Sequence, residues 1–161
     1  MQVKKGELLL LYHVLENLKN RKSNVKFSYF VAKNKLALQG EVDALNEAQE
    51  ASEPFKLYDQ KRAELAANMA DRLGDTNQPM TQNGQYVITK RKEEFDSELE
   101  KLKKTYAEVI EERDKQIEVF RDLLEEKIDF KGHGTKLENI PGEIEPVVME
   151  SLIKTGLILE D

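Results

Sequence analysis

Residues 90–127 read KRKEEFDSELEKLKKTYAEVIEERDKQIEVFRDLLEEK, and this stretch decides the predicted fold. Its apolar side chains recur at intervals of four and three residues: Phe95, Leu99, Leu102, Tyr106, Val109, Ile117, Phe120 and Leu124. This spacing places them on one narrow stripe of an α-helix, the seam that packs against another helix. The stretch contains neither Pro nor Gly, so the pattern predicts one uninterrupted helix of about 57 Å.

Arg113 occupies a position of this seam that is otherwise apolar. A polar residue there sets the register or the choice of partner at some cost in stability. Alternatively, the long side chain of Arg113 extends out to water. Asn34 interrupts the stripe of the helix predicted to face this one. We therefore expect Arg113 and Asn34 to contribute to the specificity of the seam.

Apolar periodicity predicts further helices before and after this stretch. Their predicted bounds are residues 7–22, 25–51, 55–73 and 143–155. Pro54 ends or kinks the second of them, because proline lacks an amide proton and clashes with the preceding turn. Asn83 and Gly84 lie between two β-capable runs, which predicts a β-hairpin over residues 80–89.

These elements predict a mainly α fold with a minor β part. The helices of residues 25–73 match the helix of residues 90–127 in length and would run antiparallel to it. The result is a long antiparallel helical hairpin, or coiled coil, over residues 25–127. The β-hairpin of residues 80–89 forms its tip, because it connects the two arms.

Residues 1–24 and 128–161, the two ends of the chain, are predicted to form a small α/β head. Three short β-capable runs would supply one small sheet: Met1–Lys5, Ile128–Phe130 and Leu157–Leu159. The head and the helical hairpin together are expected to form a single domain, residues 1–161.

The composition favours long helices with an exposed face over a compact enzyme core, since 35% of the residues are charged and 39% hydrophobic. The chain contains no Cys, which excludes disulfides and cysteine nucleophiles and fits an intracellular protein. Its longest apolar run, Leu8 to Tyr12, is too short to span a bilayer, so we expect no membrane association.

Positive charge is concentrated at the start of the chain, although the net charge is −6. Residues 1–36 carry eight Lys or Arg and two Asp or Glu. A basic cluster with one aromatic residue is the candidate binding surface: Lys19, Arg21, Lys22, Lys26, Tyr29, Lys33 and Lys35. Such residues neutralise phosphates and stack on bases, or they pair with acidic groups of the fold or of a protein partner. The acidic remainder of the chain makes nucleic acid the less favoured partner.

The loop of residues 131–136, KGHGTK, is the second candidate, with Lys131, His133 and Lys136 as its functional side chains. Its glycines leave the backbone open, but it is not a P-loop, which requires GxxxxGK[ST] after a strand and before a helix. It is therefore either a plain loop or a small phosphate site.

No catalytic or metal-binding set is recognisable. The only other histidine, His13, lies in an apolar helical pattern and is expected to be structural. The carboxylates of residues 90–127 fall on the outer faces of the predicted helix, whereas acid–base catalysis needs carboxylates held in a pocket. No Gly-x-Ser-x-Gly motif occurs. We expect no enzyme activity, no cofactor and no metal.

Three features of the chain resemble a family of small uncharacterised proteins from tailed bacteriophages and prophages. They are the segment Phe27-Ser28-Tyr29-Phe30-Val31-Ala32-Lys33-Asn34, the following helix with Leu38, Val42 and Leu45, and Ile140-Pro141 before a closing helix. The resemblance implies a viral, intracellular context, and it brings no established activity and no functional residues.

Together, the helices and the resemblance predict a non-enzymatic phage-type interaction protein that acts through helical surfaces. It would be a virion or assembly component, or a binder that inhibits a host protein, located in the host cytoplasm or the virion. A protein partner is expected, with self-association as a further option. The alternative is a nucleotide- or nucleic-acid-binding module that uses the basic cluster or the loop of residues 131–136.

Overall fold

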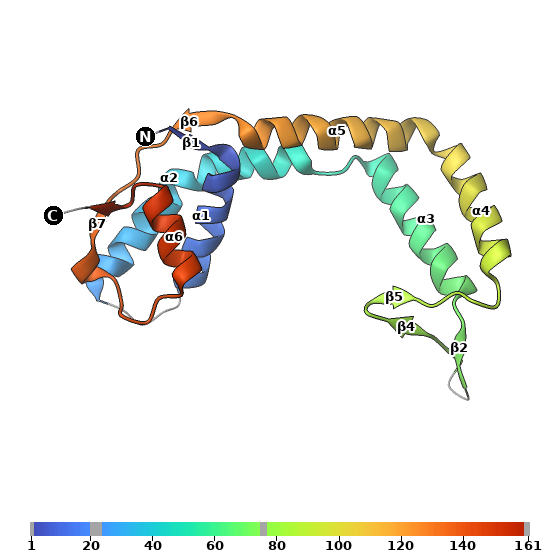
Figure 1. Ribbon diagram of the computed structural model, residues 1–161. Helices are drawn as coiled ribbons and strands as arrows, with labels where there is room; N and C mark the ends of the chain where they lie inside the picture. The colour runs from blue at the N-terminus through green and yellow to red at the C-terminus, as the bar shows by residue number, and fades with distance from the viewer. Residues whose placement is uncertain (1, 20–23, 75–76, 160–161) are drawn as a thin grey trace. The chain divides into compact units, whose positions relative to one another are not determined.

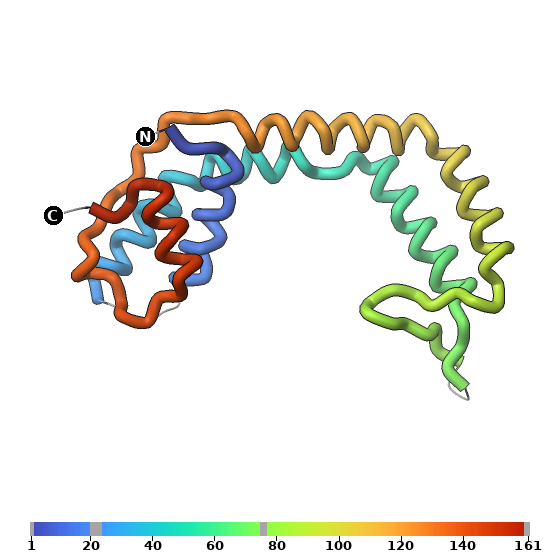
Figure 2. Tube along the Cα trace, viewed as in Figure 1, coloured from blue at the N-terminus to red at the C-terminus, as the bar shows by residue number. Residues whose placement is uncertain are grey.

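A computed structural model describes residues 2–19, 24–74 and 77–159 of the chain (Figure 1). The fold is mainly helical with short paired strands, as predicted. Its contacts cluster into two compact units, each of which is described by itself. Unit 1 comprises Met1–Glu50 and Glu118–Asp161, and unit 2 comprises Ala51–Ile117. Both ends of the chain belong to unit 1 (Figure 2).

Unit 1 is built around the packing of two helices, α1 and α2, with a third helix, α6, against α1. The helices described wholly within unit 1 are α1 (Lys5–Leu18), α2 (Val25–Gln49) and α6 (Pro146–Lys154), with a 3-10 helix, η2, at Leu137–Asn139. Its core contains large apolar side chains that are almost fully buried: Leu8, Leu11, Leu15, Phe27, Phe30, Leu38, Leu152 and Leu157. Burial of this set is the main stabilising contribution to unit 1.

The short strands at the chain ends form two separate pairs and not the single predicted sheet. β1 (Gln2–Lys4) is antiparallel to β6 (Lys127–Asp129), whereas β8 (Ile158–Leu159) is parallel to β7 (Thr135–Lys136). The prediction of one sheet was wrong because the chain leaves β6 at residue 130 and is then fixed against α2. This path places β7 beside β8. The C-terminal run, residues 158–159, therefore pairs with residues 135–136 and not with β1.

Local capping fixes the start of α2. The Asn24 side chain accepts a hydrogen bond from the Phe27 amide at 2.8 Å, the usual role of an N-cap asparagine. Its Nδ2 also donates to the Asn139 carbonyl at 3.0 Å, which ties η2 to this helix end. The helix ends at Gln49, two residues before the predicted end.

Unit 2 contains an antiparallel helix pair, α3 (Glu53–Met69) and α4 (Lys92–Thr105), which pack against each other. At one end of the pair the rings of Tyr58 and Tyr106 lie 5.6 Å apart. At the other end Arg91 donates to the Asn68 carbonyl at 3.4 Å. Pro54 lies in the first turn of α3, a position that tolerates proline because the amide there needs no helical partner.

The predicted β-hairpin is present as β4 (Thr81–Gln82) and β5 (Gln85–Tyr86). Asn83 and Gly84 have φ values of 50° and 76°, which is the left-handed pair that a two-residue turn requires. A second pair, β2 (Arg72–Leu73) with β3 (Gln78–Pro79), was not predicted.

The helix predicted to run to Leu73 ends at Met69, so this boundary was wrong. Backbone hydrogen bonds explain the early end. The Asp71 amide donates to the Val87 carbonyl at 2.8 Å, and the Met80 amide donates to the Asp71 carbonyl at 2.7 Å. Residue 71 is therefore held by residues 80 and 87, next to the strands, and cannot continue the helix.

The predicted single helix of residues 90–127 was also wrong, because it is divided at Tyr106 into α4 and α5 (Ala107–Glu125). Tyr106 has φ −109° and ψ 21°, outside the helical region. The Thr105 hydroxyl donates to the Lys101 carbonyl at 3.0 Å, a back-bond that bends helices. The Tyr106 ring is meanwhile engaged by Tyr58. No Gly or Pro is needed for this break, which is why the sequence pattern did not show it.

Candidate functional site

Asn34 is the residue that organises the best-defined site of unit 1. Its side chain is fully buried, at 0% exposure. Its Nδ2 donates to the Phe30 carbonyl at 2.9 Å and to the His133 carbonyl at 2.8 Å, while its Oδ1 accepts from the His133 amide at 2.8 Å. The amide of Asn34 thus pairs with both backbone groups of His133 and fixes the loop of residues 131–136 on α2.

The two glycines of this loop permit close packing against the end of the chain. A Cβ placed on Gly132 would lie 2.3 Å from Leu157 Cδ2 and 2.7 Å from the Phe130 ring, and one on Gly134 would lie 2.6 Å from Leu159 Cδ2. Neither glycine has a positive φ, so space and not backbone strain requires them. The prediction that these glycines leave the backbone open for a ligand was wrong, because both glycines allow close packing instead.

The fixed loop and α2 enclose a cleft of about 250 Å³, which we call the cationic cleft. Its lining residues come from α2, the loop, η2 and β8: Lys26, Tyr29, Phe30, His133, Gly134, Thr135, Lys136, Asn139 and Leu159. The basic cluster and the loop, two separate candidates in the sequence, therefore contribute to one site. No carboxylate occurs among its described lining residues.

Tyr29 lines this cleft and lies beside two other side chains, those of His133 and Lys33. Its ring meets the His133 ring edge to face, with centroids 5.4 Å apart and planes at 83°. Lys33 Nζ lies 6.0 Å from the Tyr29 centroid, at the outer limit of a cation–π contact. Lys26, Tyr29 and Lys33 share one face of α2 because they are three and four residues apart. Lys131, which the sequence grouped with the loop, is exposed and does not line the cleft.

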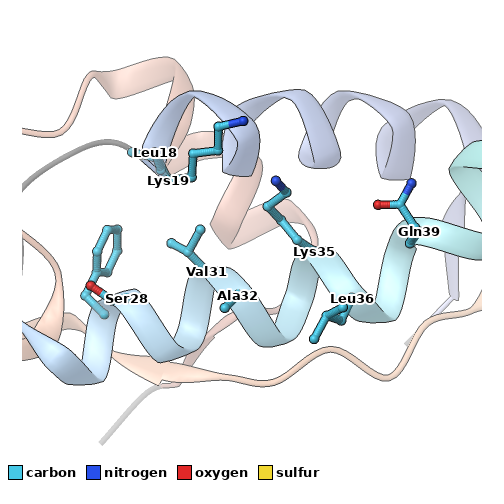
Figure 3. A pocket seen from close by; sticks show the side chains of 9 residues that line it. Leu18, Lys19, Ser28, Val31, Ala32, Lys35, Leu36 and Gln39 are labelled. Carbon is cyan, nitrogen blue, oxygen red and sulfur yellow. The ribbon is translucent and has the colours of Figure 1, made fainter.

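A second concave feature, the α1–α2 groove, has a volume of about 420 Å³. It is lined by Leu18, Lys19, Phe27, Ser28, Val31, Ala32, Lys35, Leu36 and Gln39 (Figure 3). Figure 3 shows Val31, Lys35 and Gln39 pointing from α2 toward α1. Leu36 is 75% exposed, an unusually open position for a leucine at the edge of a groove. The sequence analysis missed this groove, although an apolar residue outside the helix stripe was its visible signal.

The lysines of the α1–α2 groove share one carboxylate. Glu16 pairs with Lys19 through one oxygen and with Lys35 through the other. Lys35 Nζ also lies 5.6 Å from the centroid of Tyr12. Two positive charges for one negative charge leave the groove rim positive, but both lysines already have partners within the fold.

Four sequence candidates remain: Arg21, Lys22, Arg113 and Asn34 in its predicted seam role. Arg21 and Lys22 lie outside the described residues. Arg113 belongs to unit 2, where its guanidinium lies 5.6 Å from the Phe55 ring centroid and donates to Gln116 Oε1 at 2.7 Å. Asn34 belongs to unit 1, and its amide is used by the loop. A role for Arg113 or Asn34 in choosing a partner stays a prediction.

Within the described residues, no group of three or more His, Asp or Glu side chains is arranged to hold a metal ion. Those residues also include no helix with the length and apolar character needed to cross a membrane. Comparison of the chain with protein-family models, curated proteins and solved structures found no match. The function therefore has to be argued from the cleft and the groove themselves.

Proposed function

We propose that this chain is a non-enzymatic interaction protein that binds an amphipathic, acidic helix of a protein partner in the α1–α2 groove. The observation that supports it most strongly is the open apolar groove with Leu36 at its edge. An exposed apolar surface beside polar residues is typical of interaction sites.

The shape of the groove suits a helix. Its residues on α2 extend from Phe27 to Gln39, a distance of about 18 Å along the helix axis. Apolar anchors at i, i+3, i+4 and i+7 of a partner helix span about 10.5 Å along its axis, so the groove is long enough to hold such a set. The volume of about 420 Å³ is sufficient for two or three such side chains.

The charge of the rim favours an acidic partner. Lys19 and Lys35 compete for the single carboxylate of Glu16, so one positive charge is left uncompensated between them. A carboxylate on the partner would pair with this excess charge and leave the apolar contacts in place. Charge complementarity of this kind sets specificity and association rate more than affinity.

The biological setting belongs to the same proposal. We place the protein in the phage context that its sequence resembles, either as a virion or assembly component or as an inhibitor of a host protein. The predicted helical hairpin, or coiled coil, of residues 25–127 belongs to the same proposal, as a helical surface for assembly or self-association. Purified phage particles and infected-cell cytoplasm, probed for this chain, distinguish the virion role from the inhibitor role.

A peptide-display selection against the full chain tests the groove. Recovered peptides should have apolar residues at helical spacing, flanked by Asp or Glu. Leu36→Asp should lower the affinity for these peptides at least tenfold, because it places a charge on the apolar edge of the groove. Val119→Asp is the matched control, because Val119 is 68% exposed but lies on α5, outside the groove. Recovery of basic or non-periodic peptides, or equal loss in both variants, would contradict the proposal.

A further inference from the structure

The cationic cleft has a chemistry different from that of the α1–α2 groove. Its described lining carries ammonium, imidazole, hydroxyl and amide groups and no carboxylate. Lys26 has no ion-pair partner among the described residues, in contrast to Lys19 and Lys35, which are held by Glu16. A cation without an ion-pair partner among the described residues, in a cleft that also carries a histidine and a phenol, is suited to an anionic ligand.

The helix end beside the cleft adds to this positive potential. Lys26 lies in the first turn of α2, and that turn contains no acidic residue. A lysine at this position is unfavourable, because its charge adds to the positive end of the helix dipole. A bound anion would offset this repulsion, because its negative charge is attracted both to Lys26 and to the positive end of the helix dipole.

The rigidity of the site is the feature that distinguishes it from a solvated patch of lysines. Both backbone groups of His133 are bound to the fully buried Asn34, and Gly132 packs against the buried Leu157. The backbone that carries the imidazole is therefore fixed beside Tyr29 before any ligand arrives. Sites fixed in advance in this way spend less free energy on ordering when the ligand binds.

The size of the cleft restricts the class of ligand. About 250 Å³ is smaller than the usual range of about 300–1,000 Å³ for pockets that enclose a whole ligand. A single tetrahedral oxyanion fits, with the rest of its molecule extending toward the exposed ring of Tyr29.

We infer that the cationic cleft binds a phosphate monoester, whose oxygens accept hydrogen bonds from Lys26 Nζ, the His133 imidazole and the Tyr29 hydroxyl. Asn34 is a positioning residue that acts through the His133 backbone. This site is independent of the proposed helix-binding groove, since the two share no lining residue.

Titration of the full chain with inorganic phosphate and, in parallel, with adenosine 5′-monophosphate tests the inference by NMR. The His133 and Phe30 amides should shift on binding, and Lys26→Gln and His133→Ala should each weaken binding about tenfold, the loss of one charge-assisted hydrogen bond. Equal affinity for the two probes assigns recognition to the phosphate group, and tighter binding of the nucleotide adds a contact with Tyr29. Either result supports the inference.

Lys154→Gln is the matched control, because Lys154 pairs with Glu150 on α6 and does not line the cleft. It should change the affinity less than about twofold, as expected for a screened surface charge. Asn34→Ala should weaken phosphate binding and also accelerate hydrogen exchange of the His133 amide. Absence of binding at low salt, or equal weakening by Lys154→Gln, would overturn the inference. Affinity that rises with oligonucleotide length would assign the cleft to a polyanion and would also overturn it.

Discussion

Units 1 and 2 are stabilised in different ways. Unit 1 buries a continuous set of Leu, Phe and Val side chains between α1, α2 and α6. In the described part of unit 2, residues 51–74 and 77–117, only Tyr58, Met69 and Ala70 are buried. The apolar seam of α4 is half-buried throughout. Buried apolar area is the dominant favourable term in folding, so this term is larger in unit 1 than in unit 2.

Contacts between rings and cations partly replace a core in unit 2. Tyr58 lies 5.7 Å from Phe55 and 5.6 Å from Tyr106, measured between ring centroids. Lys61 lies over Tyr106 and Arg113 over Phe55, at 5.5 and 5.6 Å from the centroids. Such contacts contribute about 0.5–1 kcal/mol each at exposed sites. A regular heptad pattern therefore does not guarantee a buried seam.

Truncation of one apolar side chain in each unit gives the largest expected effect. Phe30→Ala removes a fully buried ring from unit 1 and should lower the free energy of unfolding by about 3–5 kcal/mol, since Phe30 is only 1% exposed. Leu102→Ala, in the half-buried seam of α4, should cost about 1 kcal/mol. Urea unfolding followed by circular dichroism measures both. Equal costs would show that a partner or a second copy buries the seam of unit 2.

Two glycine substitutions in unit 1 should have opposite signs. Gly132→Ala forces a Cβ against Leu157, which is itself 1% exposed and cannot move aside, and overpacking of this kind costs about 1–3 kcal/mol. Gly40→Ala, in the middle of α2 with nothing within 4 Å, should stabilise by about 0.5–1 kcal/mol because alanine restricts the unfolded chain. Thermal unfolding of the two variants should therefore shift in opposite directions. A neutral Gly132→Ala would mean that the loop is not held as tightly as its contacts indicate.

The elements with a strong local signal could be predicted from the sequence. The stripe of α2 specifies its buried side, and Asn83-Gly84 specifies the β4–β5 turn. The break at Tyr106 could not be predicted, because it depends on a ring from α3 and a threonine back-bond, neither of which changes the periodicity. The same holds for the end of α3, which is decided by residues 80 and 87.

The sequence predicts which residues belong to the candidate sites, but not where these residues lie relative to one another. Lys26, Tyr29, His133 and Lys136 were named from charge and loop composition, and the fold brings them to one cleft. Asn34 looked like a polar position in a helix seam, whereas its amide holds a loop 99 residues away in sequence. The periodicity of the sequence does not reveal a long-range pairing of this kind. The α1–α2 groove was missed because it depends on how two helices pack.

The smallest expected effect concerns Asp71, which connects the end of α3 to the start of α4 in unit 2. Its carboxylate accepts hydrogen bonds from the Thr89 hydroxyl and from the Thr89 and Lys90 amides, the latter two at 3.2 Å. These bonds, that of the Thr89 hydroxyl above all, hold the pKa of Asp71 below its ordinary value of 3.8. A carboxylate whose pKa is lowered in the folded state stabilises that state at pH values above the ordinary pKa. That contribution is lost as the pH falls through the lowered pKa.

Unit 2 should therefore open locally in acid before the core of unit 1 is affected. Hydrogen exchange of the Val87 and Met80 amides, whose backbone bonds adjoin Asp71, should become faster relative to core amides of α1 as the pH falls below 3.8. In Asp71→Asn this relative change should disappear, because the amide side chain does not titrate. Glu111→Gln is the control, since Glu111 also has a lowered pKa but pairs with Lys115 on the outer face of the helix. If Glu111→Gln abolished the change as well, the acid sensitivity would belong to surface charge in general. The lower acid stability of unit 2 would then not depend on Asp71 alone.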